Sequence, residues 1–219
     1  PKTLLTHWID CFFIILFCLF IFFPILIILS KGLVNIAIAT DKLVLSAMNS
    51  ILVALLATFI NLTFSLALCL LIVDEKRKFL KTFFEVGSFS IICVSPLVFG
   101  TALFLILFEH IDLSANALLL TGFTNGVLMI PISLAILLPG FKKIKARYGK
   151  LMNIIGVSGT RELAKFYVPL LKKNIKFSCA LVFALSIGDL GIIVLFSGND
   201  IGTLPMYLYR LIGSYRMDE

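Results

Sequence analysis

Residues 141–173 read FKKIKARYGKLMNIIGVSGTRELAKFYVPLLKK and form the longest polar interruption in an otherwise apolar chain. This basic segment holds nine of the 19 Lys and Arg residues and a single acidic residue, Glu162. Loops rich in Lys and Arg between apolar runs mark the cytoplasmic side of membrane proteins, because these residues resist translocation. Apolar residues recur at helical spacing on both sides of Gly156. We therefore expect the basic segment to be cytoplasmic and to carry folded structure of its own.

The composition of the chain indicates a membrane protein. Of its 219 residues, 60% are hydrophobic and 14% are charged, whereas a soluble domain carries about 25% charged residues. Such a chain cannot bury its apolar surface by folding on itself, so its solvent must be lipid. The formal charge of +7 lies in loops beside the apolar runs, which favours a membrane over nucleic acid as the partner of these cations. We predict an all-α, polytopic transmembrane bundle that forms one domain over residues 1–219.

Five apolar runs predict five membrane spans, given that a bilayer core is about 30 Å thick and a helix rises 1.5 Å per residue. They cover residues 9–29, 50–73, 83–108, 118–138 and 175–196. We expect Pro139 and Gly140 to end the fourth span. The second span contains Asn61, Thr63 and Ser65, and these polar side chains predict that one face of this helix lies against protein rather than lipid.

The distribution of Lys and Arg among the connections predicts the topology. Residues 74–82 contain four and the basic segment nine, whereas residues 31–49 contain two and residues 109–117 contain none. The N-terminus of the chain is therefore expected inside and residue 219 outside. Since the number of spans is odd and Pro1 is not an initiator residue, we expect a longer protein with a sixth span beyond residue 219.

The sequence contains no recognisable set of catalytic residues. His7 and His110 are predicted on opposite sides of the membrane, and no phosphate-binding GxxxxGK[ST] loop occurs. The five Cys residues all lie in apolar runs without a CxxC pair, which indicates small hydrophobic side chains rather than metal ligands or disulfides. We expect no enzymatic activity, no metal and no bound cofactor in this chain.

Two interpretations of the basic segment follow from its residues. Ser158 is a suitable N-cap for a helix that follows the break at Gly156, so the segment predicts two short amphipathic helices joined at a glycine elbow. These helices would either dock to a cytoplasmic protein or rest on anionic lipid headgroups, which attract their Lys residues. The residues alone leave both alternatives open.

A family resemblance favours docking to a protein. Gly156-Val157-Ser158, followed by residues 166–171 (FYVPLL) with Pro169 at the expected distance, resembles the cytoplasmic signature of ABC importer permeases. The chain departs from that signature upstream, where residues 150–152 (KLM) stand in place of the usual Glu-Ala-Ala. The resemblance implies that residues 141–173 couple the chain to two cytoplasmic ABC ATPase subunits through Leu151, Ile155, Gly156, Val157, Ser158, Gly159, Arg161 and Pro169.

Two other stretches extend the resemblance. Residues 95–100 (SPLVFG) match the third-span pattern of the wider family. Residues 185–216, with the motifs IGDLG at 187–191 and TLPMYLY at 203–209, are similar to the second half of importer permeases for thiamine and thiamine pyrophosphate. The resemblance implies that this chain is the C-terminal half of a longer two-half permease in a bacterial inner membrane.

The function implied by the resemblance is ATP-driven import of thiamine or a related small cationic solute. The chain would form half of the translocation pathway, beside a homologous half and membrane lipid. A periplasmic or extracellular binding protein would deliver the substrate, and the ATP would be used by the partner subunits. The alternatives are an ATP-independent secondary transporter or channel, or an importer for another substrate such as ferric iron or a polyamine.

Asp189 is the clearest candidate for the pathway itself. A carboxylate within a span costs roughly 2.5–3.5 kcal/mol near the bilayer centre on insertion scales, so a functional role is the default hypothesis. The alternative is a packing carboxylate that pairs with Arg210 or with the other half of the transporter. Small or helix-distorting residues in the third and fifth predicted spans predict close approach of helices along the pathway. These candidates are Pro96 and Gly100 in the third span, and Gly188 and Gly191 in the fifth.

The tail after the fifth span is expected at the external face. It carries aromatic residues that could offer cation–π surfaces to a cationic substrate or form an interfacial aromatic belt. The candidates there are Tyr207, Tyr209, Arg210 and Tyr215.

Overall fold

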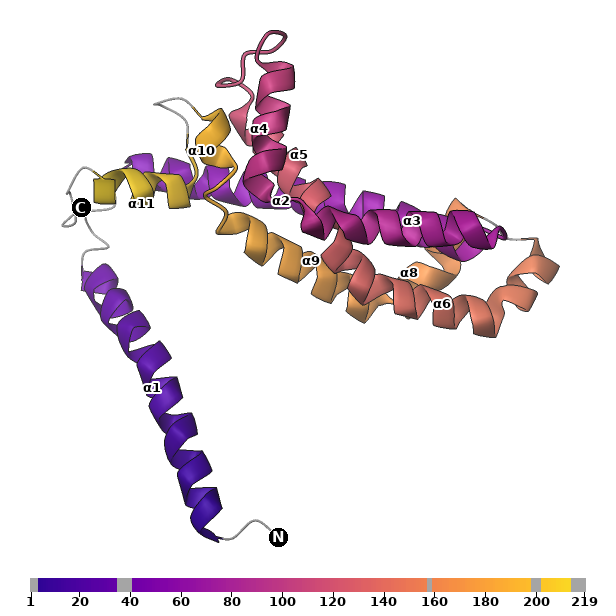
Figure 1. Cartoon of the computed structure of the whole chain (residues 1–219), viewed down its shortest axis with the longest axis horizontal. Helices are drawn as coiled ribbons and strands as arrows, with labels where there is room; N and C mark the ends of the chain where they lie inside the picture. The colour runs from indigo at the N-terminus through magenta and orange to yellow at the C-terminus, as the bar shows by residue number, and fades with distance from the viewer. Residues whose placement is uncertain (1–3, 35–40, 157–158, 198–201, 214–219) are drawn as a thin grey trace. The chain divides into compact units, whose positions relative to one another are not determined.

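The computed structural model describes residues 4–34, 41–156, 159–197 and 202–213, and its helices are drawn in Figure 1. Throughout these residues the regular elements are helical, as the sequence predicted. The chain divides into two compact units, one of residues 1–44 and one of residues 45–218.

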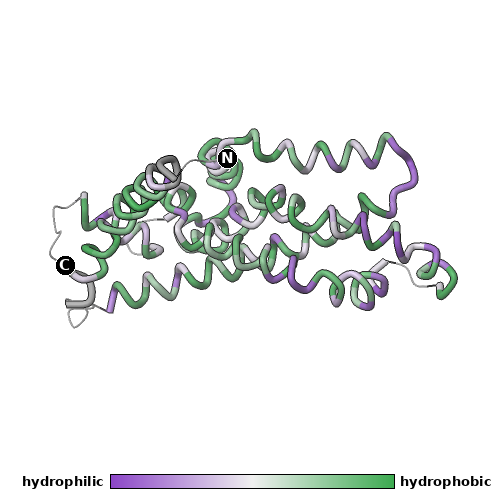
Figure 2. The backbone as a smooth tube through the Cα atoms, turned by 90° about the horizontal axis from the view of Figure 1, so that it is seen from below, coloured by the Kyte–Doolittle hydropathy of each residue, from purple (hydrophilic) through white to green (hydrophobic). Residues whose placement is uncertain are grey.

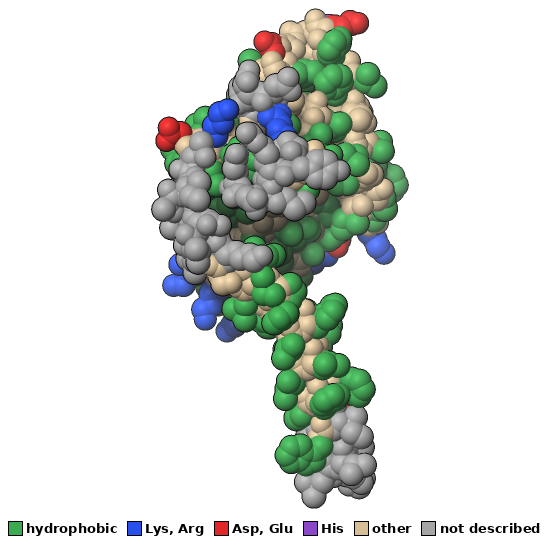
Figure 3. Space-filling model, turned by 90° about the vertical axis from the view of Figure 1, so that its left-hand side faces the viewer, with side chains coloured by type: hydrophobic (Ala, Val, Ile, Leu, Met, Phe, Trp, Pro, Cys, Tyr) green, Lys and Arg blue, Asp and Glu red, His purple; other side chains and the backbone are tan. Residues whose placement is uncertain are grey.

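The first unit contains α1 (Leu4–Val34), a single helix of 31 residues with Pro24 inside it. Its residues 10–30 are long and apolar enough to cross a membrane. Hydrophobic side chains cover the face of α1 visible in Figure 3. A helix that is apolar all round suits burial in lipid, so the first predicted span is confirmed and extends a few residues further at each end.

Helix α2 (Asp41–Asp74), which belongs to the second unit from residue 45 onward, is a continuous helix of 34 residues that starts well before the predicted span. Its buried positions form one stripe that includes Ser50, Ala57, Asn61 and Ser65. Small and polar residues on that stripe allow other helices to approach closely and to exchange hydrogen bonds with it. The prediction that this helix lies against protein on one face is confirmed.

The predicted third span is two helices rather than one. Helix α3 (Lys78–Ser90) continues through a short 3₁₀ turn, η2 (Ile91–Cys93). Helix α4 (Pro96–Leu107) follows at an angle of 96°. The break lies before Pro96, where Ser95 is extended with ψ 133°, because proline disfavours the helical conformation of the residue before it.

The predicted fourth span is also bent, and its predicted end is wrong. Helix α5 (Ala117–Leu128) meets α6 (Ile130–Ile155) at a bend of 43°. Helix α6 continues through Pro139 and Gly140, although proline removes one backbone hydrogen bond from the helix. A Cβ at Gly140 would lie 2.5 Å from Leu171 Cδ2. The glycine therefore lets α6 pack closely on the residues that follow the basic segment, rather than ending the helix.

The remaining elements follow the glycine break after α6. Residues 160–170 form one helical stretch made of α7 (Thr160–Glu162), the π-helical turn η3 (Leu163–Tyr167) and α8 (Val168–Leu170). Helix α9 (Lys172–Ile187) ends in a turn before α10 (Ile193–Phe196), and α11 (Leu204–Gly213) closes the described chain. The fifth span predicted at residues 175–196 is therefore not one continuous helix.

The structure supports a polytopic membrane protein. Among the described residues, two helices are long and apolar enough to cross a membrane, or up to four if each bent pair makes one span. In the second unit α6 packs against α9 and α3 (Figure 1). Figure 2 shows the hydrophilic residues gathered at the end of this unit where α2 ends and the basic segment lies.

Two hydrophobic clusters form the interior of the second unit. The larger joins α2 and α6 to the basic segment, and its buried members are Cys69, Ile72, Ile130, Leu134, Leu137, Leu138, Phe141, Ile144, Met152, Tyr167 and Leu171. The smaller surrounds α10, and its buried members are Leu113, Ala117, Ile192, Ile193, Phe196 and Met206. The basic segment is thus part of the packed core and not a loose connection.

Candidate functional site

The end of α6 and the start of α7 form an exposed tip at the basic end of the second unit. Gly156 ends α6 in the left-handed conformation, with φ 69°, and Gly159 precedes α7 with φ 61°. Glycine adopts such angles without a steric cost, which explains the reversal of the chain here. Val157 and Ser158, both predicted to take part in coupling, lie outside the described residues, and the residue that immediately precedes α7 is Gly159.

The tip presents apolar side chains to its surroundings. Ile154 is 83% exposed, and Leu151 and Ile155 are also exposed. Arg161 is exposed beside them, and Pro169 is exposed in α8. We call residues 151–156 and 159–161 the coupling tip. The structure thus brings most of the predicted coupling residues to one place, whereas Pro169 lies further along the chain.

The stretch that follows the coupling tip is fixed to α6 by an aromatic pair. Tyr167 is fully buried, and its ring stacks on Phe141 with 4.2 Å between centroids and 9° between planes. The π-helical turn η3 ends at Tyr167. Because a π turn contains an extra residue, it changes which side chains of the stretch face α6.

A partly buried ionic cluster joins three elements behind the tip. Lys145 Nζ lies 2.7 Å from Asp74 Oδ1 and 2.8 Å from Glu162 Oε1. The Tyr167 hydroxyl donates to the same Glu162 oxygen at 3.2 Å, and Glu162 is only 2% exposed. We call Asp74, Lys145, Glu162 and Tyr167 the anchor cluster. It ties the end of α2, the middle of α6 and the α7–η3 stretch to one another.

The environment of the anchor cluster shifts two of its pKa values. Burial lowers the pKa of Lys145, but hydrogen bonds and charge attraction from Asp74 and Glu162 outweigh it and leave the pKa raised. Burial, followed by the negative charges of Glu162 and Asp74, raises the pKa of Tyr167. Lys145 is therefore a cation and Tyr167 a neutral hydrogen-bond donor at any physiological pH.

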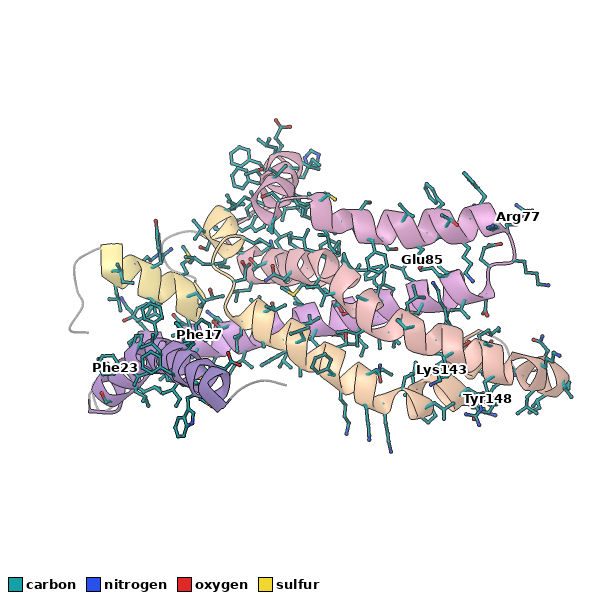
Figure 4. All side chains as sticks on the ribbon, turned by 60° about the horizontal axis from the view of Figure 1, so that its bottom comes forward. Phe17, Phe23, Arg77, Glu85, Lys143 and Tyr148 are labelled. Carbon is teal, nitrogen blue, oxygen red and sulfur yellow. The ribbon has the colours of Figure 1, made fainter. Side chains whose placement is uncertain are left out.

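Sequence reasoning did not identify the anchor cluster. Glu162 was visible as the one acidic residue among nine cations, which was the available signal that it has a specific partner. The partners could not be chosen, because three lysines of α6 lie within four residues of one another. Lys142 instead forms a surface ion pair with Glu85 of α3 at 2.7 Å, and Figure 4 labels this glutamate.

A chain of polar side chains crosses the interior between α2, α6 and α9. Asn61 Nδ2 donates to the carbonyl of Gly126 at 2.9 Å, and its Oδ1 accepts a hydrogen bond from Ser133. Ser178 donates to Ser133 Oγ at 2.8 Å. In an apolar solvent such bonds satisfy groups that would otherwise be costly to bury. The network therefore fixes the register of these helices.

Asp189 lies in the turn between α9 and α10, whereas the sequence predicted it within a continuous fifth span. Its Oδ1 accepts a hydrogen bond from the Gly191 backbone N–H at 3.2 Å. Its Oδ2 is buried and has no hydrogen-bond partner in the described part of the chain. The sequence left open an ion pair between Asp189 and Arg210. Among the described contacts of the Asp189 carboxylate there is no such pair. Gly188 is exposed beside it.

The other predicted pathway residues lie close to this turn. A Cβ at Gly100 of α4 would lie 2.8 Å from Leu195 of α10, and a Cβ at Gly191 would lie 3.7 Å from Leu97. The predicted close approach of helices occurs at Gly100, whereas Pro96 is exposed at the start of α4. Gly191 and α4 thus meet although nearly a hundred residues separate them.

The predicted external residues lie on α11, except for Tyr215, which is outside the described residues. Tyr209 is 58% exposed, and Tyr207 is partly buried. Arg210 donates to Met206 Sδ at 3.8 Å. Two bonds join this region to α2: Leu204 N donates to Ser50 Oγ at 2.7 Å, and Asn49 donates to the Gly202 carbonyl at 3.1 Å.

Within the ranges that the structure describes, no group of three or more His, Cys, Asp and Glu residues is placed to hold a metal ion. The features that the geometry does provide are the coupling tip, the anchor cluster behind it and the carboxylate in the break after α9. They can support contact with a partner and movement of helices.

Comparisons with known proteins agree with the motifs. No family model matches the chain. It is 36% identical over 135 residues to the thiamine transport system permease protein ThiP of Escherichia coli, which is 62% of this chain and 25% of that protein. It is 27% identical to ThiP of Brucella abortus, covering 87% of this chain and 38% of that protein. It is 28% identical to ThiP of Haemophilus influenzae, covering 94% of this chain and 40% of that protein.

A further relative has another name. The probable transport system permease protein NifC of Clostridium pasteurianum is 28% identical, over 81% of this chain and 64% of its own length. The chain spans between a quarter and two fifths of the ThiP proteins that it matches. Over most of its length the chain is thus similar to permease proteins of thiamine transport systems, and the predicted resemblance to ABC importer permeases is confirmed.

Proposed function

We propose that this chain forms half of the translocation pathway of an ATP-driven importer for thiamine or a related small cationic solute. The similarity to three permease proteins of thiamine transport systems supports the substrate class. The chain would hydrolyse no ATP itself, and two cytoplasmic ABC ATPase subunits would supply the energy. A homologous permease half would complete the pathway.

The observation that carries this proposal is an exposed apolar tip on a fixed support. Ile154 is 83% exposed, and apolar surface presented at a polar end of a molecule favours a binding partner. Through the buried Glu162, the anchor cluster joins residues 162–170, which follow the tip, to α2 and α6. A push on the tip would therefore move these helices instead of bending a loop.

The orientation belongs to the proposal as well. The basic segment would lie in the cytoplasm by the positive-inside rule, with the N-terminus of the chain inside and residue 219 outside. The α10–α11 region would then face a binding protein on the external side. Transport would proceed by alternating access, in which ATPase closure changes the packing of the helices around the pathway.

The test uses the complete transporter, purified with its ATPase and reconstituted in vesicles. Ile154→Glu places a charge on the tip and should abolish both ATPase co-purification and uptake of labelled thiamine, with unchanged membrane insertion. Ile154→Leu keeps the apolar area and should behave as the native protein. ATPase binding and uptake that survive Ile154→Glu would contradict the assignment of the tip as the docking surface.

One observation supports an ATP-independent secondary transporter as a second candidate. The buried Asp189 Oδ2 has no partner among the described residues, and membrane carboxylates can carry coupling ions. Uptake driven by an ion gradient in vesicles without ATPase and without ATP would favour this candidate. Because the chain is also similar to the permease NifC, other substrates should be tested. Ferric iron and polyamines are the competitors to add to the thiamine uptake assay.

A further inference from the structure

A groove of about 380 Å³ lies between α6 and the start of α9, apart from the coupling tip. Lys143, Arg147, Tyr148 and Asn174 supply its polar side chains, and the exposed Leu170 contributes apolar surface above the buried Leu171. Figure 4 labels Lys143 and Tyr148 on α6. The closely packed Gly140 and Leu171 hold α6 and the start of α9 together at this groove.

Within the part of the chain that the structure describes, the two cations of the groove, Lys143 and Arg147, form no ion pair. Lys142 and Lys145, on either side of Lys143, form ion pairs with carboxylates, but no described carboxylate pairs with Lys143 or Arg147. The Arg147 guanidinium instead lies 5.4 Å from the centre of the Tyr148 ring. Three more exposed cations begin α9 and raise the local positive potential; they are Lys172, Lys173 and Lys176.

The position of the groove along the helices identifies the membrane surface. Helix α6 is apolar before Gly140 and basic after it, and α9 changes from basic to apolar after Lys176. The groove lies at both transitions, where lipid headgroups meet the protein. Arg147 precedes Gly156 by nine residues, about 14 Å along the helix, so the groove is separate from the surface proposed to bind the ATPase.

We propose that this groove binds one anionic phospholipid. The lipid phosphate lies between the Lys143 ammonium and the Arg147 guanidinium, which can contact two phosphate oxygens at once. The glycerol and first acyl carbons lie against the apolar surface of Leu170, beside Gly140. Basic pockets between transmembrane helices are suited to such headgroups, and here the unpaired cations and the apolar surface occur together.

The experiment measures lipid retention by the full-length protein in native mass spectrometry, with phosphatidylglycerol or phosphatidylcholine added. Phosphatidylglycerol should be retained in preference to phosphatidylcholine. Lys143→Gln with Arg147→Gln should lower the affinity for phosphatidylglycerol by about tenfold, since each Lys or Arg near an anionic surface contributes to attraction. The matched control, Lys150→Gln with Lys165→Gln, removes two exposed cations of the same segment outside the groove and should change the affinity less than twofold.

Three outcomes would overturn the proposal. Retention by the Lys143/Arg147 double variant equal to that of the native protein would show that the groove is not the site. Displacement of the lipid by inorganic phosphate or glycerophosphoglycerol would show that the acyl region is not bound. Loss of ATPase binding with unchanged lipid retention would make the groove a protein contact instead. A thermal unfolding curve for each variant confirms that it remains folded.

Discussion

Three lysines of α6 illustrate how closely spaced residues of one type acquire different roles. Successive residues of an α-helix are turned by about 100° from one another, so Lys142, Lys143 and Lys145 face three directions. The first pairs with Glu85 at the surface, the second lines the groove, and the third reaches the buried Glu162. Removing the same charge at each position should therefore have different consequences.

Lys145→Met should release the stretch after the coupling tip. The change leaves the Glu162 carboxylate buried without its cation, at a cost on the order of 3 kcal/mol, toward the low end for a buried pair because Lys145 is partly exposed. Hydrogen–deuterium exchange should show faster exchange in residues 160–171. Lys142→Met removes a surface pair and should cost less than about 1 kcal/mol. Equal exchange in the two variants would contradict a structural role for the anchor cluster.

The same cluster predicts a simple pH response. The pKa of Lys145 is raised above its ordinary value of 10.5, so its stabilising contribution is complete below that value and is lost as the pH rises through the higher folded value. Exchange in residues 160–171 attributable to Lys145 should therefore be constant between about pH 6 and pH 9 after correction for intrinsic exchange rates. A transition in that range would assign the stability of the stretch to another group.

Gly156 allows a second test at a single residue. Its φ of 69° disfavours other L-residues, yet a Cβ there would meet nothing within 4 Å. Gly156→Trp should therefore leave a folded, inserted protein, at a backbone cost of roughly 1–2 kcal/mol, while its side chain blocks the docking surface and uncouples transport from ATP hydrolysis. Gly156→Asn tolerates the left-handed angle and is the control. Uptake by Gly156→Trp at the native rate would show that the tip is a connection at the surface and not the docking site.

At this scale the sequence indicated the break at Gly156 but not the anchor cluster. A glycine between two periodic apolar patterns is a local signal, and it was sufficient. The meeting of Glu162 with Lys145 and Tyr167 depends on the π-helical turn η3 and on the packing of the stretch against α6. Residue spacing predicts neither the π-helical turn nor this packing, because an ordinary α-helix would place Tyr167 on a different face.

Helices α2 and α5 approach each other closely at Gly126. A Cβ at Gly126 would lie 3.0 Å from the Ala57 carbonyl oxygen and 2.9 Å from Ile60 Cγ2. The Asn61 side chain also bonds to the Gly126 carbonyl. Close backbone approach and this hydrogen bond depend on each other, as is common between membrane helices.

Gly126→Val should separate these two helices. The added side chain meets backbone that cannot move aside, so the free energy of unfolding should fall by about 2–3 kcal/mol, and the melting temperature of the purified protein should fall with it. Gly87→Ala in α3, where a Cβ would meet nothing within 4 Å, should be neutral or stabilising by up to about 1 kcal/mol. Similar melting temperatures for the two variants would mean that the α2–α5 contact contributes little.

The helices themselves were predicted better than their ends. Apolar length located each membrane helix, but Pro96 and Pro139 have opposite effects that composition does not distinguish. Before Pro96 the chain turns by 96°, whereas at Pro139 the helix continues. The difference arises from tertiary contacts, because the neighbouring Gly140 packs against Leu171 and this contact favours continuation of α6.

For the whole transporter, Asp189 is the residue with which to test passage of a cation. Asp189→Asn keeps the shape and the hydrogen bond to Gly191 but removes the charge. If the carboxylate faces the substrate, the initial rate of thiamine uptake should fall on the order of tenfold, equivalent to 1.4 kcal/mol in the barrier, with unchanged protein stability. If it only packs helices, uptake should persist and the melting temperature should change instead.

The class of fold could be predicted from the sequence, and so could the end of the molecule at which coupling is proposed. Both predictions came from the charge distribution and the motifs, and the similarity to thiamine transport permeases agrees with the class of fold. The meeting of α4 with the turn after α9 could not be predicted in detail. Gly100 and Leu195 are far apart in the chain, and a single sequence does not show which pairs of distant residues touch.

The continuity of α6 has a mechanical consequence. Helix α6 runs for 26 residues from the bend at Met129 to Gly156, about 39 Å at 1.5 Å per residue. A continuous helix of that length would act as a lever arm with its pivot at the bend, so a tilt of about 5° would displace its far end by about 3 Å. A small rotation of α6 at the bend and a displacement of several ångströms at the coupling tip would then be the same movement of one helix.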